Sequence, residues 1–272
     1  MNELLKIEGI GEKIVQNILD DNIKKEIKKH ITYMDKNDID IISINEEKYP
    51  KILKEIYDPQ ISLYVKGNTE ILNNKAIAIV GCRDATEYGK KAAKYFSYNL
   101  SKDGINIVSG LARGIDSYAH IGNICAQDEE SEKKQKTDKL KINMLEYNHQ
   151  YGKTIAVVGN GLDIVYPKEN IFLFDKIIET GGAIISEYPL GTKPDKMNFP
   201  ARNRIVSGMS KGIIVIEAKE KSGTLITVDF ALEQGRDVYV VPGNINSINS
   251  VGTNDLIKQG ARLVTNYIDI EE

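Results

Sequence analysis

Two apolar, β-branched runs that each end in glycine constrain the fold of this chain most strongly. The first is Ala-Ile-Ala-Ile-Val at 76–80, followed by Gly81, and the second is Ile-Asn-Ile-Val-Ser at 105–109, followed by Gly110. Each run leads directly into a helical pattern, which is how a buried parallel strand feeds a turn that can bind phosphate. The pair predicts half of a Rossmann-like sheet.

The first of these turns departs from the dinucleotide-binding fingerprint. Arg83 stands where the second glycine of G-x-G-x-x-G would let a pyrophosphate touch the backbone. The second strand ends in Ser109 and Gly110 rather than in an acidic residue, so the usual ligand for the ribose of NAD is missing. We therefore expect a guanidinium, and not a dinucleotide, at the mouth of this sheet.

From residue 75 onward, strand and helix patterns alternate, which requires a parallel sheet with crossover helices. Runs such as Ile-Ile-Val-Ile at 213–216 are apolar on both sides, as in strands that are covered on both faces. The predicted fold class is α/β, with an extended Rossmann-like, mostly parallel sheet and helices on both faces. The predicted strands are 40–43, 62–65, 76–80, 105–109, 154–158, 183–186, 213–217, 238–241 and 262–264, and the predicted helices begin near Glu87, Gly114, Lys168, Asn198, Gly223 and Gly252.

Residues 1–38 have a different pattern, in which apolar residues at helical spacing flank Gly9-Ile10-Gly11. This pattern resembles a helix-hairpin-helix, whose glycines let backbone N–H groups approach a DNA phosphate. A helical hairpin whose glycine turn serves only packing is the alternative. The predicted domains are therefore a small helical hairpin domain at 1–38 and a Rossmann-like DNA-binding domain at 39–272.

One segment of the second domain interrupts the alternation. Residues 127–151 are low in apolar side chains and mixed in charge, with the run Asp-Glu-Glu-Ser-Glu-Lys-Lys-Gln-Lys at 128–136. A segment of this composition cannot bury enough apolar surface to form a core element. We expect a mobile surface insertion here.

The composition limits the compartment and the ligands. Cys82 and Cys125 have no paired spacing and no Cys/His cluster around them, which argues against a disulfide framework and a zinc site. No apolar run approaches the roughly 18 residues of a membrane span, and the charged start has no cleavable apolar core. We expect a cytoplasmic protein without metal, cofactor or membrane partner. Because the net charge is −3, a polyanion would need a local basic patch.

Such a patch is predicted at the carboxyl ends of the strands, where open α/β sheets bind their ligands. Arginine recognises phosphate with two parallel hydrogen bonds, and a helix start offers free N–H groups to an anion. The alternative is that the arginines in these loops only form structural ion pairs with acidic residues such as Glu187 and Glu217. The groups in these loops are Arg83, Arg113, Arg202, Arg204 and the helix start Ser222-Gly223-Thr224.

Catalytic constellations are not evident in the sequence. The chain lacks G-x-x-x-x-G-K-[ST], which argues against a P-loop NTPase. Of the three histidines, His30, His120 and His149, the second follows an alanine in an apolar helix and is typical of a packing residue. No Ser/His/Asp or Cys/His set can be assembled.

Five motifs, in order along the chain, carry a resemblance to a known family. They are G-x-R-x-x-T-x-Y-G at 81–89, SGLARGID followed by Ala119-His120, NFP-x-RNRI at 198–205, SGTLIT at 222–227 and ALEQGR at 231–236. Together they resemble the DNA-processing protein A family (DprA, also called Smf), over about residues 39–261. The resemblance implies a non-catalytic protein that binds and protects incoming single-stranded DNA and helps load the RecA recombinase in natural transformation, commonly as a homodimer. The DNA-binding positions that it implies are Arg83, Ser109, Gly110, Arg113, Lys168, Phe199, Arg202 and Asn203.

An enzyme of another class is the alternative function. Phosphoribohydrolases that resemble lysine decarboxylases share this type of sheet and carry P-G-G-x-G-T-x-x-E after the fifth strand. Here the corresponding stretch, Lys-Ser-Gly-Thr-Leu-Ile-Thr at 221–227, has neither the paired glycines nor the nearby glutamate. The sequence therefore favours a DNA-binding protein over a nucleotide-cleaving enzyme.

Overall fold

The computed structural model describes residues 3–140 and 150–270. The chain forms two compact units, Met1–Asp40 and Ile41–Glu272. The first contains helices α1 (Glu12–Leu19) and α2 (Asp21–Lys36), preceded by one 3-10 turn at Leu4–Lys6. The predicted helix before the glycine turn is thus only this single turn. It ends near Gly9, whose φ of 85° is incompatible with a right-handed helix.

The second unit is built on a sheet whose described strands follow the order β1-β2-β6-β5-β4-β3-β7-β8-β9. The strands from β6 to β9 in this order run parallel, whereas β2 is antiparallel to β6. The extended, mostly parallel sheet is therefore confirmed. The strands are β1 (Ile39–Ser43), β2 (Ser62–Gly67), β3 (Ala76–Val80), β4 (Asn106–Ser109), β5 (Thr154–Val158), β6 (Ala183–Ser186), β7 (Gly212–Val215), β8 (Asp237–Val240) and β9 (Arg262–Leu263).

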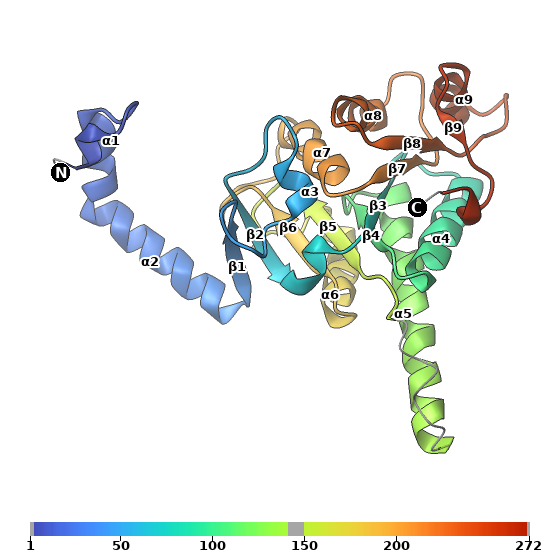
Figure 1. Ribbon diagram of the computed structural model, residues 1–272, viewed down its shortest axis with the longest axis horizontal. Helices are drawn as coiled ribbons and strands as arrows, with labels where there is room; N and C mark the ends of the chain where they lie inside the picture. The colour runs from blue at the N-terminus through green and yellow to red at the C-terminus, as the bar shows by residue number, and fades with distance from the viewer. Residues whose placement is uncertain (1–2, 141–149, 271–272) are drawn as a thin grey trace. The chain divides into compact units, whose positions relative to one another are not determined.

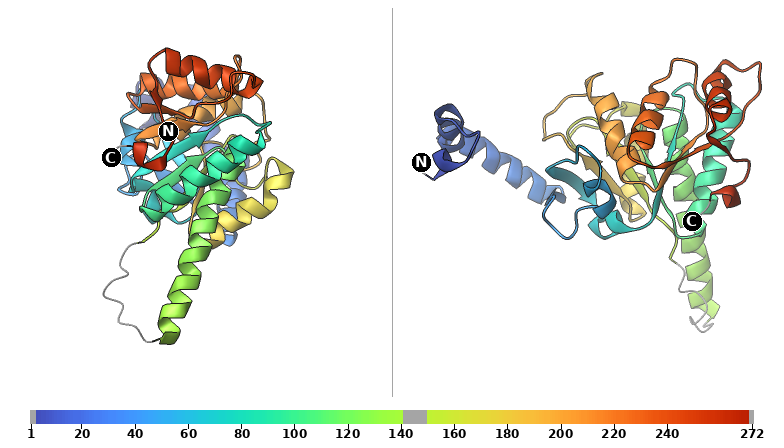
Figure 2. Two further views of the ribbon diagram at one scale, coloured as in Figure 1. Left: turned by 90° about the vertical axis from the view of Figure 1, so that its right-hand side faces the viewer. Right: turned by 45° about the horizontal axis from the view of Figure 1, so that its top comes forward.

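Helices cover both faces of this sheet, as expected from its apolar strands (Figures 1 and 2). Within β3, Ile77 and Ile79 pack with α4 and α5, while Ala78 and Val80 pack in the opposite cluster with α7 and α8. This alternation is the two-residue period of a strand that is buried on both sides. The helices are α3 (Lys51–Lys54), α4 (Glu87–Lys102), α5 (Ile115–Leu140), α6 (Ile171–Glu179), α7 (Asn198–Gly208), α8 (Gly223–Glu233) and α9 (Val251–Lys258). Within the described ranges, none of them has a stretch long and apolar enough to cross a bilayer.

The segment predicted as a mobile insertion is in part regular. Helix α5 continues to Leu140, well past the expected start of the insertion at Gln127, and extends beyond the sheet in Figure 1. The side chain of Gln127 is buried, and its amide donates a hydrogen bond of 2.7 Å to the carbonyl of Gly152. The predicted insertion therefore begins within helix α5, since a long helix can carry a polar sequence once its first turns are packed. Residues 141–149 lie outside the described residues.

The strand order places a crossover at β3. The chain leaves β3 toward β4, β5 and β6 on one side and then returns to add β7, β8 and β9 on the other. In a doubly wound sheet, the crevice at the carboxyl ends of the two strands that flank such a reversal is where ligands bind. The fold therefore points to the loops that follow β3 and β7.

His120 lies in the packed core between α5 and the sheet. It is fully buried, and its Nδ1 lies 2.7 Å from the hydroxyl of Thr154 at the start of β5. Burial lowers the pKa of His120 to about 3, because the imidazolium would lose its hydration. The histidine is a neutral packing residue, as the sequence predicted.

This burial predicts an acid-sensitive contribution to stability. The folded pKa of about 3 lies below the ordinary value of 6.5, so the unfolded chain binds the proton more readily and stability is lost as the pH falls through this window. Between pH 7 and pH 5, the wild type should lose about 2 kcal/mol of unfolding free energy that His120→Gln does not lose. Urea unfolding at both pH values measures the difference. An identical pH dependence in both proteins would contradict a neutral, buried His120.

Candidate nucleic-acid interface

A cleft of about 620 Å³ opens at the carboxyl ends of β3 and β7, where the crossover of the sheet predicts a ligand site. Its walls come from the loops after β3, β4, β5, β6 and β7, from the start of α5, from α7 and from the first turns of α8. Its polar lining residues are Arg83, Asp84, Asp116, Tyr166, Lys196, Arg202, Asn203, Lys219, Lys221, Ser222, Thr224 and Thr227. In the described part of the chain, no three His, Cys, Asp or Glu side chains gather in a way that could hold a metal ion.

Arg83 and two aromatic rings form a stack in this cleft, which we call the Arg83 stack. The guanidinium lies 5.5 Å from the centre of the Phe199 ring, and Phe199 stacks on Tyr166 with 5.5 Å between ring centres. Arg83 is exposed and has no carboxylate partner among the described residues. The stack offers an unpaired cation beside two flat apolar faces, which is the combination that binds single-stranded nucleic acid.

The loop that carries Arg83 is held by the start of α5. The N–H of Ile115 donates to the carbonyl of Cys82 at 3.1 Å. Gly114, with a φ of 74°, packs so closely that a Cβ there would overlap the carbonyl oxygens of Cys82 and Arg83. Glycine is required at this position, and its close approach fixes the direction in which Arg83 leaves the sheet.

Arg202 has a different role from Arg83, although both line the cleft. Its side chain is 4% exposed, and its Nη1 donates to the carbonyl of Gly110 at 2.7 Å and to the carbonyl of Val157. Burial lowers its pKa to about 10, so it is charged at neutral pH. Burial also raises the pKa of Asp116, while the charge of Arg202 and hydrogen bonds from the backbone of Ala112 and Gly110 oppose that shift. Arg202 therefore stabilises the floor of the cleft, and its N–H donors are largely used by internal acceptors.

The remaining predicted DNA-binding residues divide between the cleft and its surroundings. Gly110 and Asn203 line the cleft. The Ser109 side chain does not, because it is fully buried and its hydroxyl donates to the carbonyl of Ile79 at 2.7 Å. Arg113 lines a smaller cavity of about 50 Å³ beside the Arg83 stack and is paired with Glu169 on the surface. Lys168 is exposed and lines neither cavity.

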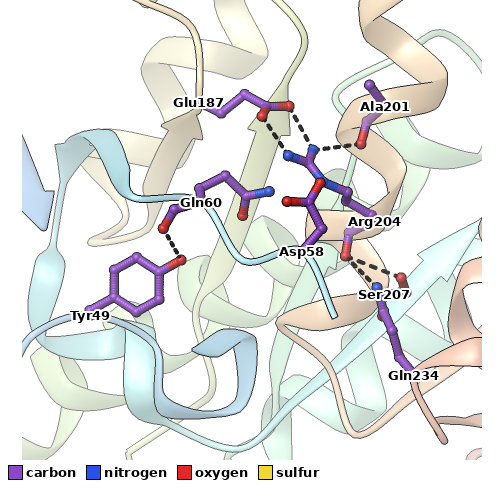
Figure 3. Close-up of polar contacts among 8 residues, drawn as sticks. All are labelled: Tyr49, Asp58, Gln60, Glu187, Ala201, Arg204, Ser207 and Gln234. Carbon is purple, nitrogen blue, oxygen red and sulfur yellow. Dashed lines mark hydrogen bonds and ion pairs between the residues drawn. The ribbon is translucent and has the colours of Figure 1, made fainter. Parts of the chain in front are cut away.

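Arg204 is a structural residue, as the alternative interpretation of the arginines held. Its guanidinium binds both carboxylate oxygens of Glu187, at 2.9 and 2.8 Å, and lies 3.3 Å from Asp58 (Figure 3). Nearby, the buried hydroxyl of Tyr49 donates to the carbonyl of Gln60 at 2.7 Å, and burial raises its pKa to about 12. The cluster ties the segment before β2 to α7 and to the end of β6.

Glu217 also has an internal role, at the start of α4. Its carboxylate is 1% exposed and accepts hydrogen bonds from the N–H of Thr86, at 3.0 Å, and from the Thr86 hydroxyl. The first helix after the first strand of a Rossmann unit normally offers its N-terminus to a pyrophosphate. Here a side-chain carboxylate occupies that position, which is a second departure from the usual dinucleotide-binding arrangement.

The predicted DNA-binding positions do not include four cationic or aromatic side chains that line the cleft. These are Tyr166, Lys196, Lys219 and Lys221. All four lie in loops that follow parallel strands, so their position relative to a strand end was available in the sequence. The sequence did not show that all four side chains would face the same cleft, because that depends on how each loop folds back over the strand that it follows.

Comparison with known proteins now identifies the family. The family model described as DNA recombination-mediator protein A matches residues 40–272. The chain belongs to this family. It is 40% identical over 235 residues to the DNA processing protein DprA of Bacillus subtilis, covering 86% of this chain and 71% of the relative. The Smf protein of Escherichia coli is 38% identical over 249 residues, which cover 92% of this chain and 60% of Smf.

Two solved structures of the family have the same fold. The DprA structure from Streptococcus pneumoniae aligns with a TM-score of 0.73 at 36% identity, over 98% of this chain and 88% of that one. A DprA structure from Helicobacter pylori, described in terms of its single-stranded DNA binding mode, aligns with a TM-score of 0.68 at 28% identity, over 85% and 93% of the two chains. The DprA family and its fold, both expected from the five motifs, are confirmed.

The contrast between two arginines of this DprA-family chain predicts different losses of stability. Arg204→Met should lower the unfolding free energy by about 3 kcal/mol, because it leaves the shielded Glu187 carboxylate without its partner. Arg113→Ala removes an ion pair whose side chains are both more than half exposed, and should cost less than about 1 kcal/mol. Denaturant unfolding of both variants checks this. Equal losses would show that Arg204 is no more structural than Arg113.

Proposed function

We propose that this chain binds single-stranded DNA in the cleft, with the Arg83 stack as its main contact. The observation that carries the proposal is the free guanidinium of Arg83 beside the rings of Phe199 and Tyr166. Bases of a single strand can stack on such rings whatever their sequence, and the guanidinium can bind a phosphate oxygen pair. A duplex keeps its bases stacked on each other and cannot use these rings.

The charges around the cleft support this proposal. Arg83, Lys196 and Lys221 line it, and none of the three has an ion-pair partner among the described residues. These are the local cations that an acidic chain of net charge −3 needs in order to bind a polyanion. Because each phosphate contact releases counterions, affinity should depend steeply on salt.

The family membership supports a wider role. We propose that the bound strand is protected in the cytoplasm and passed to a RecA recombinase in natural transformation, with a homodimer of this chain as the working form. The H. pylori relative, a DNA processing protein A described by its single-stranded DNA binding mode, supports the first step. The recombination-mediator description of the family supports the second.

We propose a binding role without catalysis. The carboxylates that line the cleft are already engaged, Asp116 with the buried Arg202 and Asp84 with Lys219 at 3.3 Å. The loop after β7 lacks the glutamate that the related phosphoribohydrolases carry. Incubation with nucleoside monophosphates should therefore release no free base, and release of base at a steady rate would support the enzyme instead.

Replacing Arg83 should weaken DNA binding without unfolding the protein. Arg83→Ala should reduce the affinity for single-stranded DNA by about 1–3 kcal/mol, the range for hydrogen bonds to charged groups. Arg83→Lys should recover only part of the loss, since it keeps the charge but not the paired geometry. Fluorescence anisotropy with a labelled oligonucleotide measures both, and thermal unfolding checks the fold.

The matched control is Arg262→Ala, which removes the same charge from edge strand β9, outside both cavities. It should change affinity far less than Arg83→Ala. If Arg83→Ala melted several degrees lower while DNA binding stayed normal, Arg83 would be a structural residue and the proposed contact would be wrong.

Binding should also discriminate between forms of DNA and between salt concentrations. We expect tighter binding to a single strand than to a duplex of equal length, with little dependence on base sequence. Affinity should fall steeply between about 50 and 200 mM salt. Titrations of both forms at several salt concentrations test this, and equal affinity for the duplex or no salt dependence would count against the mechanism.

A further inference from the structure

The loop after β7 and the start of α8 form a part of the cleft that the Arg83 stack does not use. We propose that this part is a subsite for a phosphomonoester, presented by the end of a DNA strand or by a free nucleoside monophosphate. The inference rests on the proposed function, because the rest of a bound strand would lie on the Arg83 stack. The lining residues that form the subsite are Lys219, Lys221, Ser222, Gly223, Thr224 and Thr227.

The first turn of α8 leaves a backbone donor free. The Ser222 hydroxyl accepts from the N–H of Thr224 at 3.2 Å, and the Ser222 carbonyl accepts from the N–H of Leu225 at 3.0 Å. The N–H of Gly223 has no acceptor among the described residues. A Cβ added at Gly223 would have no neighbour within 4 Å, so space for a ligand exists beside this N–H. Free N–H groups and the helix dipole favour an anion here.

Thr227 provides a second, independent indication. Its side chain is 2% exposed and lines the cleft, yet its hydroxyl has no hydrogen-bond partner in the described part of the chain. Residues four apart lie on one face of a helix, so the side chain of Thr227 lies on the same face as Gly223, one turn earlier. The hydroxyl is therefore available to donate a hydrogen bond to a phosphate oxygen in the cleft.

The charge of the subsite favours a doubly charged phosphate. Lys219 is paired with the exposed Asp84 at 3.3 Å, whereas Lys221 is exposed without a partner among the described residues. The other carboxylate of the cleft, Asp116, is balanced by the buried Arg202. A phosphomonoester carries close to two negative charges at neutral pH, against one for a phosphate within a strand. The unpaired lysine and the free N–H therefore favour a terminal phosphate over an internal one.

Gly223 allows a backbone donor to be removed without breaking the helix. Proline is favoured at the first position of a helix, where it lacks only the free N–H. Ser222, which precedes it, has φ −120° and ψ 141°, the extended geometry that proline requires of its predecessor. Gly223→Ala keeps the N–H and is the matched control. Thr227→Val removes the buried hydroxyl at nearly constant shape.

The binding experiment uses three oligonucleotides of one sequence, with a 5′-phosphate, with a 3′-phosphate and with neither. The wild type and Gly223→Ala should bind one phosphorylated form about tenfold more tightly than the unphosphorylated form, as one charged hydrogen bond allows. Gly223→Pro should lose this preference, and Thr227→Val should reduce it. Competition with dAMP separates a strand end from a free nucleotide as the ligand. If dAMP displaces the labelled oligonucleotide although the three oligonucleotides bind equally, the subsite takes a free nucleotide.

Two results would overturn the subsite and leave the proposed function intact. One is equal binding of all three oligonucleotides by the wild type with no competition by dAMP. The other is an end preference that Gly223→Pro and Thr227→Val both retain in full, which would place the phosphate elsewhere. Failure of the wild type to bind any of the three oligonucleotides would instead contradict the proposed function itself.

Discussion

The cleft depends on one buried guanidinium, that of Arg202. It reaches from α7 to the carbonyls of Gly110 and Val157, which end β4 and β5, and its charge faces the buried Asp116 at the start of α5. A cation at this depth is costly unless hydrogen bonds and a counter-charge replace its hydration. Because Arg202 has both, it joins two strand ends and two helices into the floor of the cleft.

A second internal charge, that of Glu217, lies at the start of α4. The Glu217 carboxylate, two residues after β7, accepts from the N–H and the hydroxyl of Thr86, the N-cap residue of α4. A side-chain carboxylate therefore lies where a dinucleotide-binding protein would hold a pyrophosphate. The start of α8 has only the side chain of Ser222 as a cap and keeps the Gly223 N–H free. On this sheet, a carboxylate lies at the start of α4, whereas the start of α8 faces the cleft with a free N–H.

The arginines of the strand ends show how residues of one type take separate roles. Arg204 and Arg202 are shielded and bound to internal partners, and Arg113 is paired on the surface with Glu169. Arg83 alone of these four has no ion pair or hydrogen bond among the described residues and lies over an aromatic ring. Burial explains Arg202 and Arg204, since an internal arginine uses its donors to stay ionised. Of the two exposed arginines, Arg113 has a neighbouring carboxylate among the described residues and Arg83 does not, so Arg83 keeps its donors for a ligand.

The sequence by itself determined the fold and the family, because β-branched runs ending in glycine and their spacing depend on local periodicity. Strands β3, β5 and β6 and the starts of α4, α7 and α8 were predicted to the residue. Only the tertiary structure decided which side chains face the cleft. Ser109 lies within the sheet and Arg202 beneath the cleft, while Tyr166 and Lys221 line it. Burial, pairing and loop direction arise from contacts between distant segments, and a single sequence does not encode these as a local pattern.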